Sequence, residues 1–201
     1  IHGEGLHGYQ AVGATSFPQA IAMASAFNPD LHREVFAAVA REMRARGVSQ
    51  VFTPMLDLAR DPRWGRVEES YGEDPYLVSR LGVACVKGFQ GDGPGIGREH
   101  VIATVKHFAV YSQPERGINY GPGNYSERLI RETFLKSFHA AITEGGALSV
   151  MPSYNEIDGI PSHANKYYLG RILREEWGFD GLIVSDYGGI DQLHNFHFVA
   201  D

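Results

Sequence analysis

The chain has 201 residues, of which 43% are hydrophobic and 21% are charged, and its formal net charge at pH 7 is −6. This is the composition of an ordinary globular protein with one sizeable core. The acidic balance argues against a nucleic-acid partner or an anionic membrane surface, and no stretch reaches the roughly 18 apolar residues of a membrane span. Cys85 is the single cysteine, which excludes an internal disulfide framework and favours a role as core filler.

The two ends of the chain say little about its compartment. Residues 1–4 do not resemble a signal peptide, so the sequence assigns no localisation. Because the chain lacks a start methionine and ends abruptly at Asp201, we expect it to be a piece of a longer protein.

Helical and strand-like segments alternate along the chain. Asn28 can cap a helix that has Pro29 at its first position and ends at Gly47. Its expected apolar face repeats every four residues, at Leu31, Val35, Val39 and Met43. Further helices are predicted over 76–89, from Ser126 to 146, and over 169–177, and apolar strands over 48–58, 101–105, 147–151 and 181–184, with a fifth strand just before Glu4. This alternation predicts βα units around a parallel sheet.

Polar side chains follow four successive predicted strands. These are the Arg66 loop, Lys106 with His107, Tyr154 with Asn155, and Asp186. In a TIM-type barrel the ends of all strands meet at one mouth, whereas in an open doubly wound sheet only the strands at the switch point converge. The pattern therefore favours a (β/α) barrel, and the number of strands falls short of eight, so we expect a single domain over residues 1–201 that is part of a barrel truncated at both ends.

Two other patterns have ordinary structural explanations. The glycines of residues 90–97 loosely imitate a dinucleotide loop, but a strand follows them where that fingerprint needs a helix. His194 and His197 are three residues apart with no third ligand nearby, which is more typical of packing or surface histidines than of a metal pair. We therefore predict no cofactor and no metal. Of the arginines near Asp61, we expect Arg60 and Arg63 to be structural.

Six blocks of the sequence resemble, in order, the signature segments of the amino-terminal barrel domain of glycoside hydrolase family three. They lie at residues 3–8 (GEGLHG), 59–66 (ARDPRWGR), 71–76 (YGEDPY), 106–108 (KHF), 150–155 (VMPSYN) and 184–187 (VSDY). The resemblance implies an exo-acting β-glucosidase or β-xylosidase that removes single sugars from non-reducing ends with retention of configuration. By position, Asp186 would be the nucleophile. The residues lining the sugar subsite would be Glu4, Arg66, Lys106, His107 and Tyr154.

The chemistry of these residue types agrees with that reaction. A retaining glycosidase needs one carboxylate to attack the anomeric carbon and a second carboxyl roughly 5 Å away as acid and base. Arg66 and Lys106 near Asp186 would keep it ionised, and Tyr154 could orient it. Because a sugar is neutral, fixed donors and acceptors such as Glu4, Lys106 and His107 would recognise its hydroxyl groups.

The sequence departs from the family pattern in two places. Tyr187 stands where the family often has tryptophan as a stacking floor for the sugar. The acid/base glutamate of the family comes from a later α/β domain, and no residue here matches it. Since removing a general acid costs on the order of 10²–10⁴ in rate, we expect these 201 residues alone to hydrolyse unactivated glycosides poorly.

The sugar and the reaction class leave alternatives. Glu4 replaces an aspartate of many related β-glucosidases, and its longer side chain would crowd the hydroxymethyl group of glucose. This substitution favours xylose as the substrate sugar. We nevertheless favour β-glucosidase on family frequency, with β-xylosidase close behind. Lys106 could instead form a Schiff base in a barrel aldolase. The third alternative is a non-catalytic sugar-binding barrel fragment.

Overall fold

The computed structural model describes residues 1–197, and five short strands form its parallel sheet. Their order in the sheet is β1-β2-β3-β4-β7, which is also their order along the chain. The bounds are β1 His2–Gly3, β2 Gln50–Val51, β3 Ile102–Phe108, β4 Ser149–Pro152 and β7 Leu182–Ile183. A doubly wound sheet reverses its order at the switch point, and this one does not. The sheet is therefore an arc of a (β/α) barrel, and the predicted fifth strand before Glu4 is confirmed.

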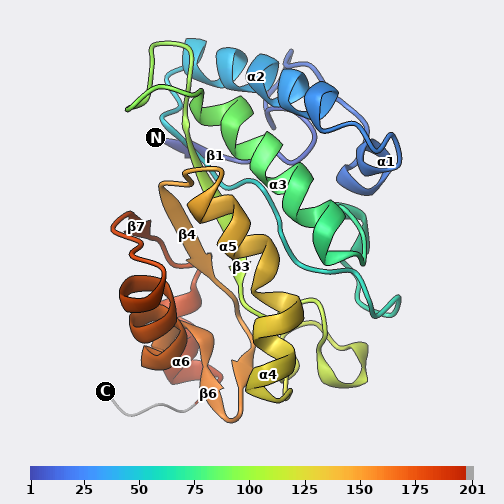
Figure 1. Ribbon diagram of the computed structural model, residues 1–201, viewed down its shortest axis with the longest axis vertical. Helices are drawn as coiled ribbons and strands as arrows, with labels where there is room; N and C mark the ends of the chain where they lie inside the picture. The colour runs from blue at the N-terminus through green and yellow to red at the C-terminus, as the bar shows by residue number, and fades with distance from the viewer. Residues whose placement is uncertain (198–201) are drawn as a thin grey trace.

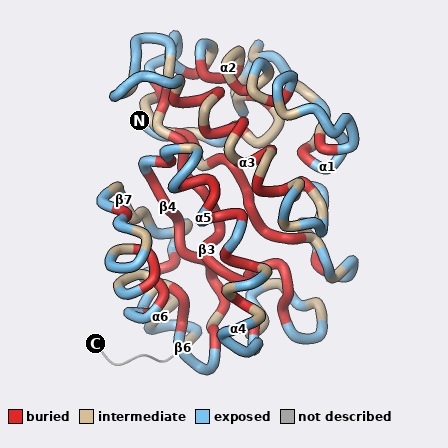
Figure 2. Tube along the Cα trace, viewed as in Figure 1, coloured by how far each residue is buried: buried red, intermediate tan, exposed pale blue. Residues whose placement is uncertain are grey.

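The helices that connect neighbouring strands lie side by side on one face of this arc (Figure 1). α2 packs against α3, and α3 packs against α5. The helical segments are α1 Ala20–Ala24, α2 Pro29–Ala45, η1 Val67–Glu69, α3 Pro75–Gln90, η2 Glu115–Gly117, α4 Glu127–Leu129, η3 Ile130–Phe134, α5 Lys136–Thr143, η4 Ser162–Ala164, η5 Tyr167–Glu176 and α6 Gly189–Asn195. Figure 2 shows buried residues concentrated along β3, β4 and α3, which places the core between the sheet and the helix layer.

Local signals in the sequence explain where the helices begin and end. The side chain of Asn28 accepts a hydrogen bond from the Leu31 N–H and caps α2, as predicted, and Gly47 ends that helix with φ +82°. Asp74 caps α3 in the same way, and Ser126 caps α4 through the Leu129 N–H. These caps satisfy amide groups that have no partner within the first turn of a helix.

Three details of the sequence interpretation are wrong. The buried face of α2 is made by His32, Phe36, Val39, Ala40 and Met43, and Leu31 is exposed. The stretch 48–58 pairs as a regular strand only over β2, and Pro54 within it has no N–H to continue the ladder. The predicted apolar strand at 181–184 forms only as the short β7, which pairs with β4 alone among the described residues, and Leu182 within it is 51% exposed.

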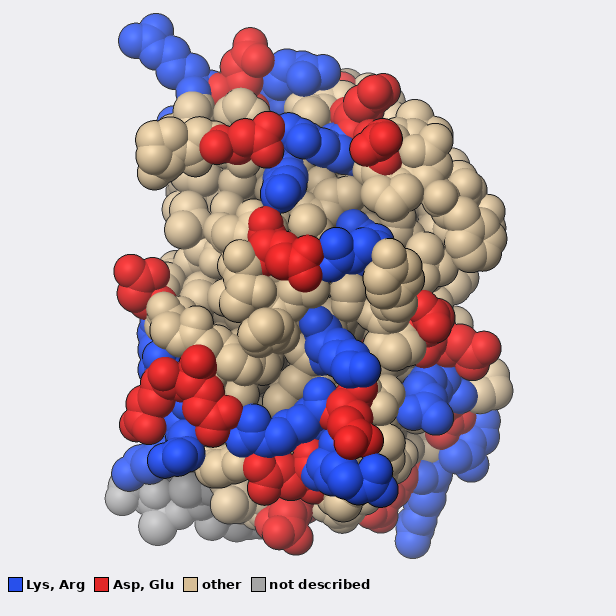
Figure 3. All heavy atoms as spheres, viewed as in Figure 1, with Lys and Arg blue, Asp and Glu red and all other residues tan. Residues whose placement is uncertain are grey.

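After β4 the chain forms a small antiparallel hairpin, β5 Glu156–Ile157 and β6 Ile160–Pro161, before η5. Cys85 is buried in the core, as expected. On the face seen in Figure 3 acidic and basic side chains are interspersed. Several acidic and basic side chains of the described residues form ion pairs, such as Arg80 with Glu144. Within residues 1–197 no helix combines the length and the apolar character that a bilayer crossing requires.

Candidate active site

Asp186 lies just beyond β7 and is held by contacts from four directions. Its Oδ1 accepts hydrogen bonds from the Tyr154 hydroxyl, at 2.9 Å, and from the backbone N–H of Tyr187, at 2.7 Å. The backbone N–H of Asp186 donates to Nε2 of His163, at 3.1 Å. Its Oδ2 lies 3.6 Å from His107 Nε2 and has no hydrogen bond within residues 1–197. A carboxylate fixed through one oxygen, with the other unsatisfied, is a feature that active sites often retain.

The hydroxyl of Tyr154 is shared between two acceptors. It lies 2.9 Å from Asp186 Oδ1 and 2.6 Å from the Tyr187 carbonyl oxygen. Burial, together with the nearby Asp186 carboxylate, raises the pKa of Tyr154 well above its usual range. Tyr154 therefore stays protonated at neutral pH and remains a donor to the carboxylate.

Lys106 and His107 both reach the site although they are neighbours in one strand. Side chains of a regular strand alternate between its two faces. Here the register between β3 and β4 shifts between Val105 and Phe108, and the irregularity breaks that alternation. Lys106 Nζ pairs with Glu4 Oε2 at 3.0 Å across to the end of β1. His107 meets Asp57 and Asp186.

His107 is fixed by Asp57, which sequence reasoning missed. Asp57 Oδ2 accepts from the backbone N–H of His107 at 3.0 Å and lies 2.8 Å from its ring Nδ1. Burial raises the pKa of Asp57 to about 7 and lowers the pKa of His107 well below its usual value. The pair thus holds the ring in one orientation, with Nε2 toward Asp186. Asp57 comes directly after an apolar run, but the predicted strand 48–58 includes it. The prediction therefore places Asp57 inside the sheet and not at the end of a strand.

Arg66 is part of the site's wall and does not pair with Asp186. Its guanidinium binds Glu69 through two hydrogen bonds of 2.7 Å and lies over the ring of Tyr111, 5.6 Å from the centroid. Tyr111 in turn packs edge-on against His107, with ring centroids 4.9 Å apart. The expected ion pairs of Arg66 and Lys106 with Asp186 are absent from the described residues, because Glu69 and Glu4 bind these cations.

Four further residues contact Asp186 or Tyr154. The Tyr187 side chain is 93% exposed, and among the described residues its ring stacks on no other ring. Tyr120 and His163 were not predicted from the sequence; the Tyr120 ring packs edge-on against Tyr154, with centroids 4.7 Å apart. Neither residue lies in a strand or in a recognisable motif, so only the folded chain reveals them. His197 binds Glu156 and the Tyr154 carbonyl oxygen.

The arrangement suits recognition of a neutral polyol beside the Asp186 carboxyl group. It offers a cation–carboxylate pair, a neutral imidazole and a phenol around Asp186. Among residues 1–197 there is no group of three or more histidine, cysteine or acidic side chains that could hold a metal ion. Lys106 Nζ donates to both carboxylate oxygens of Glu4, a contact that fits an ion pair and gives no support to a Schiff base.

Comparison with known proteins agrees over the full chain. Residues 1–201 match the family described as the glycosyl hydrolase family 3 N-terminal domain. A curated β-xylosidase of Formosa agariphila is 49% identical over 100% of this chain and 29% of its own length. A periplasmic β-glucosidase of Salmonella typhimurium is 37% identical over 98% of this chain and 25% of its own.

Solved structures give the same result. A β-glucosidase from Erythrobacter marinus superposes with a TM-score of 0.98 at 45% identity, covering 100% of this chain and 27% of that one. The β-glucosidase from Listeria innocua in complex with glucose superposes with a TM-score of 0.92 at 42% identity, covering 99% and 27%. The chain thus spans 29% or less of the length of these relatives. The match over the whole chain shows that the chain belongs to glycosyl hydrolase family 3, within the N-terminal domain of that family.

Proposed function

We propose that the protein is an exo-acting, retaining β-glycosidase that removes terminal β-D-glucosyl or β-D-xylosyl units, with Asp186 as its nucleophile. The observation that carries the proposal is the orientation of the Asp186 carboxylate by Tyr154, beside His107 and the Lys106–Glu4 pair. The names of the relatives, β-xylosidase and β-glucosidase, support xylose and glucose as the two candidate sugars.

In the first step a carboxylate oxygen of Asp186 forms a bond to the anomeric carbon while the bond from that carbon to the leaving oxygen breaks, and the leaving oxygen takes a proton from the acid/base carboxyl. In the second step water adds to the anomeric carbon, loses a proton to the acid/base, and releases Asp186. Tyr154 keeps the carboxylate oriented in both steps, because its hydroxyl donates to Oδ1.

We infer that the acid/base carboxyl comes from a part of the protein outside residues 1–197. The acidic groups that border the site in the described residues are already engaged: Glu4 by Lys106, Asp57 by His107, and Glu69 by Arg66. The 201 residues would then be a single domain that supplies the nucleophile and the glycone subsite of a larger enzyme. The match covers only 29% of the β-xylosidase of Formosa agariphila, which supports a second part of the enzyme as the source of the acid/base carboxyl.

The glycone subsite is proposed to be lined by Glu4, Arg66, Lys106, His107 and Tyr154. Glu4 is half-exposed, with one face bound to Lys106, so its carboxylate can accept from sugar hydroxyls. Tyr187, exposed beside the nucleophile, offers a ring against which the sugar can stack.

The test uses the intact enzyme and nitrophenyl β-glucoside and β-xyloside. Asp186→Ala should lower kcat/KM by about 10⁴-fold or more, as loss of a nucleophile does, whereas the exposed Asp180→Ala should leave it unchanged. A 2-deoxy-2-fluoro glycoside should label Asp186, as seen by mass spectrometry of the peptide. A label on another residue, or full activity of Asp186→Ala, would overturn the proposal. The ratio of the two kcat/KM values identifies the preferred sugar.

A further inference from the structure

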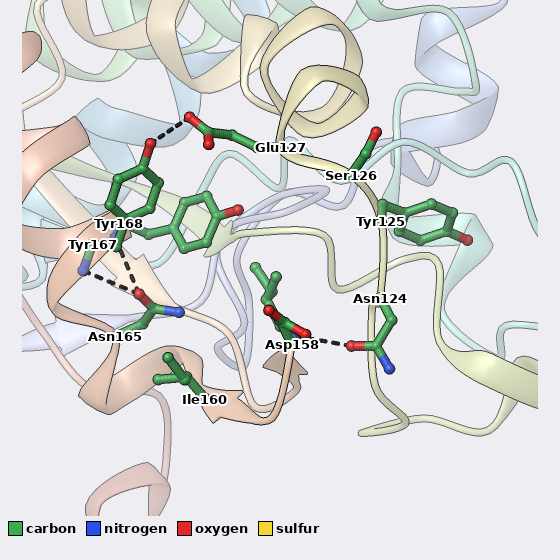
Figure 4. A pocket seen from close by; sticks show the side chains of 10 residues that line it. Asn124, Tyr125, Ser126, Glu127, Asp158, Ile160, Asn165, Tyr167 and Tyr168 are labelled. Carbon is green, nitrogen blue, oxygen red and sulfur yellow. Dashed lines mark hydrogen bonds between the residues drawn. The ribbon is translucent and has the colours of Figure 1, made fainter.

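A cavity lies beside the β5–β6 hairpin, and none of the residues that line it is a hydrogen-bond or ion-pair partner of Asp186. It has a volume of about 600 Å³, which is within the range of small-molecule sites. The hairpin, the chain before α4 and the beginning of η5 form its walls (Figure 4). Its lining residues are Asn124, Tyr125, Ser126, Glu127, Ile157, Asp158, Ile160, Asn165, Tyr167 and Tyr168.

Two buried polar side chains face this cavity with unused hydrogen-bonding groups. Asn165 is 2% exposed, and its Oδ1 accepts from the backbone N–H groups of Tyr167 and Tyr168. Its Nδ2 donates to no group within residues 1–197, and it points into the cavity in Figure 4. Tyr168 is 7% exposed, and its hydroxyl also has no hydrogen bond in the described part of the chain. Both donors lie at the surface of the cavity, where a ligand that carries oxygen acceptors can bind them.

The opposite side of the cavity supplies acceptors. Asp158 and Glu127 carry carboxylates, and Asp158 is held in place because its backbone N–H donates to Asn124 Oδ1 at 2.9 Å. Burial, together with the Glu127 carboxylate, raises the pKa of Tyr168 to about 12, so its hydroxyl keeps its proton. The cavity therefore presents both donors and acceptors.

The lining excludes most other ligand classes. No lysine or arginine lines it, and nearby Arg131 is fully used by Glu127, Glu176 and the Tyr167 hydroxyl, so an anion has no counter-charge. An apolar ligand would leave the Asn165 and Tyr168 donors unsatisfied. A divalent cation would need more ligands than the described residues gather.

We propose that this cavity binds a neutral sugar, with Asn165 Nδ2 and the Tyr168 hydroxyl donating to ring or hydroxyl oxygens and Asp158 accepting from hydroxyl groups. A pyranose has apolar ring faces and polar hydroxyl groups. The aromatic rings of the cavity match the first, and its amide and carboxylate groups match the second. The tyrosine rings and the two isoleucines contact its apolar face. This site is separate from Asp186 and does not depend on the role of that residue in catalysis.

The test measures binding of cellobiose and xylobiose by isothermal titration calorimetry. The protein is the intact enzyme carrying Asp186→Ala and Lys106→Met, which prevent turnover and weaken the catalytic pocket. In that background Tyr168→Phe and Asn165→Asp should each weaken the remaining binding by about threefold to tenfold, the effect of one hydrogen bond. Asn165→Asp keeps the Oδ1 that caps η5, so the fold is preserved while the donor is lost.

Tyr125→Phe is the matched control, because it removes a hydroxyl from the same cavity that points away from Asn165 (Figure 4). It should leave binding unchanged. Equal binding in all three variants would overturn the proposal, as would the absence of any binding outside the catalytic pocket. Binding of calcium chloride or inorganic phosphate in place of either sugar, lost in the Tyr168→Phe variant, would also overturn it.

Discussion

Two buried histidines, one in the helix layer and one at the end of β3, have opposite surroundings. His32 in α2 is 3% exposed and packs edge-on against Phe36 and Tyr71, with its Nε2 lacking any hydrogen bond in the described residues. His107 is 1% exposed, yet its ring is bound by Asp57 and faces Asp186. Burial lowers the pKa of both.

The difference teaches that burial alone does not mark a functional histidine. His32 serves as a neutral aromatic filler, and protonation of its ring would only destabilise the layer. His107 is buried among groups that fix its orientation, which is what a binding site requires. The following predictions test whether the strand end is truly built for function and the helix layer for stability.

The largest expected effect is on activity, at the Lys106–Glu4 pair. Lys106→Met removes a cation that is 4% exposed and leaves the Glu4 carboxylate without its partner. We expect kcat/KM of the intact enzyme to fall by about 10²-fold to 10³-fold, the range for removing one preorganised donor of an active site. Arg80→Met removes the exposed Arg80–Glu144 pair of the helix layer and should leave activity unchanged. A similar loss of kcat/KM in both variants would contradict the assignment of function to the strand end and of stability to the helix layer.

The next effect concerns the pH dependence of stability through His32. Its pKa in the folded protein is lowered to about 4 from 6.5 by burial. The stability that it contributes is therefore complete above about pH 6.5 and is lost as pH falls through 4, a loss of about 3 kcal/mol. His32→Phe should remove this loss from the free energy of unfolding in urea measured at pH 7 and pH 3, whereas the exposed His139→Phe should not. An unchanged acid slope in His32→Phe would contradict the assignment.

At the strand end, Tyr154→Phe removes the hydroxyl that donates to Asp186 Oδ1. We expect a decrease of about 10-fold to 100-fold in kcat/KM, the value of a hydrogen bond to a charged group. Tyr120→Phe is a matched control, because its ring packs on Tyr154 while its hydroxyl makes no hydrogen bond to the described residues. Steady-state kinetics of the two variants would distinguish orientation of the carboxylate from simple ring packing.

The smallest effects separate two helical glycines. A Cβ on Gly88 of α3 would lie 2.6 Å from the backbone carbonyl oxygen of Arg33 in α2, so Gly88→Ala should destabilise the helix layer by about 1–3 kcal/mol. A Cβ on Gly170 of η5 meets nothing within 4 Å, and Gly170→Ala should stabilise by about 0.5–1 kcal/mol. Urea unfolding of both variants measures the two signs, and the same sign in both would refute the packing argument.

Much of the fold follows from local signals. Capping by Asn28 and the apolar strand segments predicted the order of helices and strands, and the polar residues after each strand predicted that distant segments meet at one mouth. Lys106 does meet Glu4, and Tyr154 does meet Asp186. These predictions succeeded because caps and strand ends depend on a few neighbouring residues.

The remainder depends on packing that no local pattern contains. His32 and Phe36 lie on the buried face of α2 while Leu31 is exposed, since the neighbouring α3 decides which face is covered. The irregularity that turns both Lys106 and His107 toward the site is visible only in the pairing of β3 with β4. Asp57 became recognisable only through its partner His107, which lies 50 positions away in the sequence.

The hairpin after β4 has one further consequence. Tyr154 precedes it and His163 follows it, and these two residues hold the carboxylate and the backbone amide of Asp186. Residues on both sides of this hairpin therefore fix the same aspartate. The tip of the hairpin is constrained as well, because Gly159 has φ +75°, a conformation that residues with a side chain rarely adopt. Lengthening either arm of the hairpin would therefore disturb the carboxylate contact and the backbone contact of Asp186 together.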